Sequence, residues 1–295
     1  VAPELHPFTL RLGVVFALIG YGTKAGLAPM HTWKPDAYRE APSPAVVLMA
    51  VGMLNGALYC VLRIHLISKA SLGPEFSEGL LLTLGLLSVL IATPFVLIQW
   101  NIKRLLAYSS IEHVGIMAIG MGLGAQGAVF GALLHMTYHS LAKPVALFSA
   151  GTLAQLHSSS NFDRIGQGTF TRAPVTSALF VLATVIITGS PPFGIFFREM
   201  TILRAGFEAS HPTATAVLLA ALIVLFCGFA YQVGHVVLGP PRDSSDRRVP
   251  KPERLDVAMA TAIAAAAIAV VSAFYLPAPL MALIRAATHV VWGRG

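Results

Sequence analysis

The chain has 295 residues, of which 56% are hydrophobic and only 11% are charged, and it carries a formal net charge of +7. A soluble globular protein has about 25% charged residues, so this composition excludes the soluble classes and predicts a polytopic membrane protein. No basic run is interleaved with aromatic residues, which argues against nucleic-acid binding and assigns the positive charge to membrane-facing loops. The cysteines, Cys60 and Cys227, lie in apolar stretches, and no CxxC, haem-attachment or iron–sulfur spacing occurs. The sequence therefore predicts no cofactor and no bound metal.

Eight apolar stretches are long enough to cross a bilayer, which needs about 20 residues. They cover residues 8–30, 43–65, 78–99, 104–123, 126–156, 174–206, 213–239 and 256–285. The expected fold class is an all-α integral membrane protein with about eight transmembrane helices. The connections after the first, third, fifth and seventh spans carry eleven Lys and Arg residues against seven on the opposite side, and five of the eleven lie in a linker at 240–255. The positive-inside rule places these connections in the cytoplasm.

The first span carries Lys24 at a depth from which a lysine reaches the surface with difficulty. Gly26 and Pro29 follow it, and they predict a helix break next to the charge. Lys24 is either a proton-carrying group or a structural lysine paired with a carboxylate. In the second span, Asn55 fits equally well as an interhelical hydrogen-bonding residue and as part of a water path.

The fourth span begins with a polar stretch that contains Ser110, Glu112 and His113. Glu112 and His113 are adjacent, so they point to different faces of the helix, and at least one is expected to face the fifth span. An interhelical ion pair is the alternative interpretation of this stretch.

The fifth span carries His135, His139 and Lys143 at a spacing of i, i+4 and i+8. This spacing keeps the three side chains on one helix face, in a column about 12 Å tall. Groups that exchange protons, aligned in single file at bilayer depth, are what a proton path requires. Pro144 cannot donate to the carbonyl of Ser140, and it predicts a further helix break. A metal site and inert packing are the alternatives for this column.

The sixth span contains Gly189, Pro191 and Pro192, which predict a second discontinuous helix at membrane depth. Glu199 follows this break by about two turns. Arg198 lies beside it, and an ion pair between the two is the structural alternative.

Four motifs occur in order along residues 15–210: GTKAGLAPMHTWKPDA, NIKRLLAYSSIEHVG, LLHMTYHSLAKPVALF and GSPPFGIFFREM. Together they resemble the antiporter-like, proton-pumping membrane subunits of respiratory complex I, Mrp-type Na⁺/H⁺ antiporters and energy-converting NiFe hydrogenases. The sequences SSIEHVG and SPPFGIF are most similar to those of the hydrogenase-4 component F group. Members of this family have about fourteen helices with two inverted five-helix repeats.

The resemblance implies a domain organisation. Residues 1–70 would hold the last two helices of the first repeat, residues 71–240 the second repeat, and residues 241–295 a loop and the final transmembrane helix. The first residue is Val, and the chain is expected to be a C-terminal fragment of a longer protein.

The resemblance also implies roles for individual residues. The proton relay would consist of Lys24, His135, His139, Lys143 and Glu199. Asn55, Ser110, Glu112 and His113 would be supporting polar residues. The sequence departs from the family at two positions: Asn55 stands where some members carry a channel lysine, and Lys34 stands where leucine is usual.

The expected function is that of a non-catalytic, proton-translocating subunit of a complex I-like or hydrogenase-type oxidoreductase complex. The alternatives are a Mrp-type cation/proton antiporter subunit and a subunit of a quinone-linked redox enzyme. The expected partners are other membrane subunits, the lipid bilayer and protons, with Na⁺ as the alternative ion, and no nucleic acid. The expected location is the prokaryotic cytoplasmic (inner) membrane.

Overall fold

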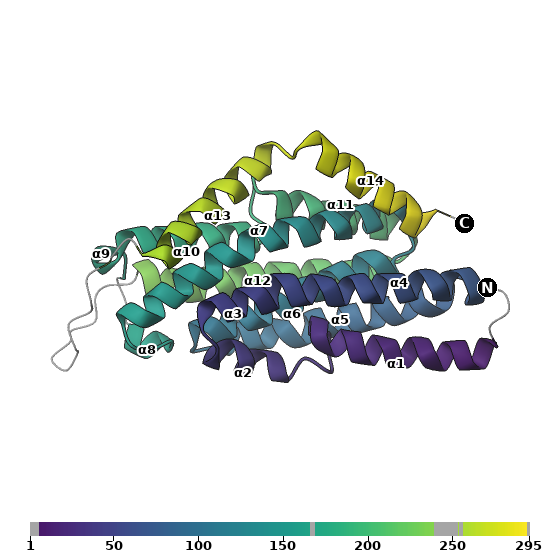
Figure 1. The fold of residues 1–295 in the computed structure, drawn as a ribbon, viewed down its shortest axis with the longest axis horizontal. Helices are drawn as coiled ribbons and strands as arrows, with labels where there is room; N and C mark the ends of the chain where they lie inside the picture. Colours follow the sequence, from purple (N-terminus) through teal and green to yellow (C-terminus); the bar gives the residue numbers. More distant parts are fainter. Residues whose placement is uncertain (1–5, 166–168, 239–252, 254–255, 294–295) are drawn as a thin grey trace.

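The computed structural model describes residues 6–165, 169–238, 253 and 256–293. The helices are α1 (Pro7–Ala25), α2 (Trp33–Glu40), α3 (Ser43–Val47), the π-helical η2 (Leu48–Met53), α4 (Leu54–Leu72), α5 (Pro74–Ile98), α6 (Ile102–Gly122), α7 (Gln126–Leu156), α8 (Phe162–Ile165), α9 (Thr169–Arg172), α10 (Pro174–Ile187), α11 (Gly194–Glu208), α12 (Pro212–Leu238), α13 (Val257–Phe274) and α14 (Ala278–Trp292). Most of the long helices run side by side along the long axis of the molecule, and α13 and α14 meet at an angle across them (Figure 1).

Several helices have the length and composition of membrane spans, which confirms the predicted all-α membrane fold. In the described part of the chain, five are long and apolar enough to cross a bilayer. They are Ser43–Leu72, Pro74–Ile98, Ile102–Gly122, Pro212–Leu238 and Val257–Phe274. The polar α7 is longer, at 31 residues, and the sixth predicted span is divided between α10 and α11.

The predicted span over residues 256–285 is divided between two helices. α13 ends at Phe274, and α14 begins at Ala278 in a different direction (Figure 1). Pro277 and Pro279 explain the interruption, because each removes a backbone donor and disfavours helix at the residue before it.

α6 is the most enclosed helix of the bundle, with every residue buried except Lys103 and Arg104. It packs between α5 and α7. The two helices α5 and α6 approach closely at Gly85 and Gly115, where a Cβ added to either residue would lie 2.8 Å from the carbonyl oxygen of the other. The polar side chains of α6 therefore face protein rather than lipid.

Both predicted breaks beside charged residues are confirmed. α1 ends at Ala25, and Gly26 caps it in the left-handed region at φ 90°, with its N–H directed to the carbonyls of the preceding turn. The chain resumes helix only at Trp33. The second break separates the end of α10 at Ile187 from the start of α11 at Gly194.

The predicted break at Pro144 is wrong, because α7 continues through this residue to Leu156. Proline in a helix removes one hydrogen bond, and here α6, α10, α11 and α13 all pack against α7. Such packing holds a proline-containing helix together within a membrane bundle.

The basic linker predicted at 240–255 lies outside the described residues, apart from Glu253. The carboxylate of Glu253 accepts hydrogen bonds from the backbone N–H groups of Val175 and Thr176, at 3.3 and 2.7 Å. It thereby satisfies free donors at the N-terminus of α10.

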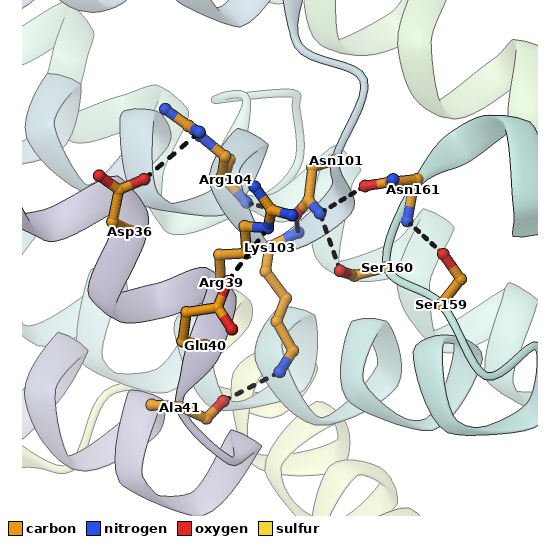
Figure 2. Close-up of polar contacts among 10 residues, drawn as sticks. All are labelled: Asp36, Arg39, Glu40, Ala41, Asn101, Lys103, Arg104, Ser159, Ser160 and Asn161. Atoms are coloured by element: carbon orange, nitrogen blue, oxygen red, sulfur yellow. Dashed lines mark hydrogen bonds and ion pairs between the residues drawn. The ribbon is translucent and has the colours of Figure 1, made fainter.

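The connections after the first, third and fifth predicted spans meet at one end of the bundle (Figure 2). Asn101 caps α6 and donates to Ser160 Oγ and Asn161 Oδ1, at 2.8 and 2.9 Å. Lys103 donates to the Ala41 carbonyl at 2.9 Å. These bonds fix the start of α6, and therefore the height of its polar residues in the bundle.

Candidate functional site

The column predicted on α7 lies inside the protein. His135, His139 and Lys143 are each 0% exposed. Their common face is directed toward α6, because the contacts of His135 and Lys143 are made with residues of that helix. The spacing of four residues thus places three ionisable groups along one buried interface.

His113 on α6 is at the centre of this interface. Its Nδ1 atom lies 2.9 Å from Nε2 of His135, and its ring centroid lies 5.0 Å from the centroids of both His135 and His139. The expectation that Glu112 or His113 faces the fifth span is therefore met by His113. The sequence suggested only a supporting role, whereas the geometry makes His113 the residue that joins the two α7 histidines.

Lys143 is held by a backbone carbonyl of α6. Its Nζ atom donates to Leu106 O at 3.0 Å, and the Ser110 hydroxyl donates to the same oxygen at 3.1 Å. None of the ion pairs within the described residues includes Lys143. The ammonium is therefore not locked to a carboxylate, which leaves it free to exchange its proton.

Two buried carboxyl groups flank the histidines. Glu112 on α6 is 4% exposed, and Glu199 on α11 is 5% exposed. A carboxylate oxygen of Glu199 and one ring nitrogen each of His113 and His135 all lie within 4.8 Å of one another. Arg198 forms no ion pair with Glu199 in the described part of the chain, so the structural alternative for this glutamate finds no support there.

His113, His135 and Glu199 offer three atoms of the types that bind a divalent metal. However, the two histidine nitrogens lie 2.9 Å apart, which is a hydrogen-bonding distance. Two nitrogens bound tetrahedrally to one zinc ion at about 2.0–2.1 Å would be roughly 3.3 Å apart. The geometry fits two imidazoles that share a hydrogen better than a metal site.

Four imidazole nitrogens of the cluster have no hydrogen-bond partner among the described residues: His113 Nε2, His135 Nδ1, His139 Nδ1 and His139 Nε2. In neutral imidazole one nitrogen donates and the other accepts. Each ring therefore keeps an atom available to bond water or pass a proton.

Two other predicted site residues lie apart from this cluster. Lys24 is exposed on the surface of α1. Asn55 donates from Nδ2 to Ser140 Oγ at 2.6 Å and so joins α4 to α7. Of the two alternatives for Asn55, this bond supports the packing role.

Lys34 and Tyr38 on α2 are both 0% exposed, and the sequence did not indicate either as a site residue. They occur in a Pro-rich, charged stretch that reads as a loop. The one feature of the sequence that distinguished Lys34 was its position, where the resemblance implies leucine.

A sequence profile described as "NADH:quinone oxidoreductase/Mrp antiporter, TM" matches residues 5–224. The chain is 37% identical over 244 residues to the hydrogenase-4 component F homolog of Methylacidiphilum infernorum, an alignment that covers 83% of this chain and 51% of the relative. It is 31% identical over 223 residues to NADH-quinone oxidoreductase subunit N of Halorhodospira halophila, which covers 75% of this chain and 46% of the relative.

A similar fold occurs in a solved structure of the membrane-bound sulfane sulfur reductase (MBS), an archaeal respiratory membrane complex. The TM-score is 0.85 at 26% identity, over 99% of this chain and 58% of the matched chain. The chain spans about half the length of the curated relatives it matches. With the profile match over residues 5–224, these likenesses establish that the chain belongs to the NADH:quinone oxidoreductase/Mrp antiporter family of membrane proteins.

Proposed function

We propose that this chain forms the proton-conducting part of a membrane subunit in an oxidoreductase complex of the hydrogenase or NADH:quinone type. The observation that carries the proposal is the convergence of α6, α7 and α11 on one buried cluster of ionisable side chains. This relay cluster consists of Glu112, His113, His135, His139, Lys143 and Glu199.

The chemistry of the relay cluster suits proton transfer. Burying ionisable groups within a membrane costs free energy, and such groups occur chiefly where ions or protons move. The contact between His113 and His135 lets one ring donate where the other accepts.

The names of the relatives suggest the setting of this activity. One is a homolog of a hydrogenase-4 component and another is a subunit of NADH-quinone oxidoreductase. We therefore assign proton translocation to this chain and electron transfer to partner subunits in the prokaryotic cytoplasmic membrane. Lys24, exposed on α1, would reach the relay cluster only through groups that lie between them.

Cation/proton antiport of the Mrp type is the second candidate function. The observation in its favour is that two carboxyl groups, Glu112 and Glu199, are buried within the bundle. Carboxylate oxygens are the ligands that hard cations such as Na⁺ prefer. Transport that requires Na⁺, with no pumping in its absence, would favour antiport over proton translocation alone.

Replacement of Lys143 tests the leading proposal. In vesicles that contain the assembled full-length complex, Lys143→Ala should reduce proton pumping by roughly 100-fold. Lys143→Arg should restore little, because a guanidinium does not release its proton in proteins. The control is Lys69→Ala, which removes a lysine that is ion-paired with Glu78 at 3.6 Å near the end of α4.

Pumping is followed with a pH-sensitive dye, and assembly is followed by native gel electrophoresis of the same membranes. Normal pumping by Lys143→Ala would show that the α7 column is packing and would overturn the proposal. Loss of assembly together with pumping would make Lys143 a structural residue.

A further inference from the structure

Lys34 is buried at the break that ends α1. It is 0% exposed, and its Nζ atom donates to the Ala25 carbonyl at 2.8 Å. The neighbouring turn leaves room for it only because residue 26 is glycine: a Cβ on Gly26 would lie 2.7 Å from both Cδ and Nζ of Lys34. The break at the end of α1 is therefore shaped around this amine.

Within the described part of the chain, no carboxylate forms an ion pair with Lys34. Burial lowers the pKa of Lys34 to about 7. Amine and ammonium forms are then both populated near neutral pH, which is what a group that accepts and releases a proton requires.

Polar side chains connect Lys34 to the relay cluster. Its Nζ atom lies 5.9 Å from the ring centroid of Tyr38, whose hydroxyl lies 3.5 Å from Ser110 Oγ. Ser110 and Lys143 both donate to Leu106 O. A series of contacts thus runs from α2 through α6 to α7 and joins the two fully buried lysines.

We propose that Lys34 is a proton-carrying residue of the translocation path and joins the broken end of α1, beside Lys24, to the relay cluster on α6 and α7. This inference rests on the proposed function and adds a step on the side of the relay cluster that faces α1 and α2.

The test uses the assembled full-length complex in vesicles, with pumping and assembly measured together. Lys34→Met keeps an unbranched chain of similar length without an exchangeable proton, and pumping should fall by at least about 10-fold. Lys34→Arg keeps the charge and a donor for Ala25 O but cannot release its proton, so it should be equally impaired. Lys34→His restores an exchangeable proton and should recover part of the rate.

Lys69→Met is the matched control and should pump normally. Lys69 lies near the C-terminal end of α4, and α4 ends at the opposite end of the bundle from α2 (Figure 1). Normal pumping by Lys34→Met, or full activity of Lys34→Arg, would overturn the inference, as would loss of assembly in every Lys34 variant. The Lys143→Ala variant is measured in parallel. If it stops pumping while Lys34→Met pumps normally, the proposed function stands and only the role of Lys34 is wrong.

Discussion

The Nδ1 atom of His113 lies 2.9 Å from the Nε2 atom of His135, and this contact joins α6 to α7 inside the bundle. The ring of His113 is also 5.0 Å from that of His139. One imidazole on α6 therefore contacts two on α7, and all three are 0% exposed. Because α6 is enclosed by other helices, the contact is shielded from lipid.

Replacement of His113 should interrupt transfer between the two helices. We expect His113→Phe, which keeps a ring of similar size without exchangeable protons, to reduce pumping by roughly 100-fold. His135 Nε2 loses its partner in this variant, which costs about 1–3 kcal/mol of stability, so the complex should still assemble. The control is His289→Phe at an exposed position on α14, which should pump normally. Wild-type pumping by His113→Phe would mean that protons bypass α6.

Glu199 should be sensitive to loss of its charge, and Glu208 should not. Glu199 is buried beside His113 and His135, whereas Glu208 is exposed and paired with Arg204 at the end of the same helix. Glu199→Gln keeps the size of the side chain and removes proton exchange, so pumping should fall by at least about 10-fold. Glu208→Gln should stay within twofold of wild type, because exposed ion pairs contribute roughly 0–1 kcal/mol. Equal rates for the two variants in the vesicle assay would contradict the role assigned to Glu199.

Gly26 should tolerate no side chain. Its φ of 90° strains any L-residue by about 1–3 kcal/mol, and a Cβ there would lie 2.7 Å from the Lys34 amine. We expect Gly26→Ala to lower the thermal stability of the detergent-solubilised complex and to reduce pumping. The control is Gly13→Ala in α1, where the added Cβ would meet no atom within 4 Å beyond its chain neighbours and its own helix backbone. That substitution should be neutral or stabilise the helix by up to about 1 kcal/mol. If the two variants melted at the same temperature, the close contact between Gly26 and the Lys34 side chain would be wrong.

The purified protein should contain no stoichiometric metal. His113, His135 and Glu199 offer suitable atoms, but the 2.9 Å separation of the two nitrogens fits a shared hydrogen. Elemental analysis of the protein, purified without chelator, should give well under one zinc, iron or copper ion per chain. One ion per chain that disappears in His113→Phe would instead assign these residues to a metal site.

Local sequence patterns determined the helical membrane architecture and both breaks. The length of the apolar stretches is sufficient to predict membrane helices, because every backbone polar group in a bilayer must be satisfied within the segment itself. Glycine and proline are sufficient to predict both helix breaks, since these residues act on the backbone of their own turn, as at Gly26 and Pro191. Proline was less decisive at Pro144, where packing around α7 maintained the helix.

The spacing of His135, His139 and Lys143 likewise determined that they share a face, because helical periodicity is local. Their partners were decided by tertiary structure. Close packing at Gly85 and Gly115 encloses α6 and turns its polar residues toward protein.

Lys34 shows most clearly what the sequence alone could not decide. It lies in a charged stretch with the composition of an exposed loop, yet its side chain is fully buried. Its environment is formed by Ala25, Gly26 and Tyr38, and Tyr38 in turn contacts Ser110 of α6. Burial of a side chain depends on which other segments cover it, and periodicity within one segment carries no information about that covering.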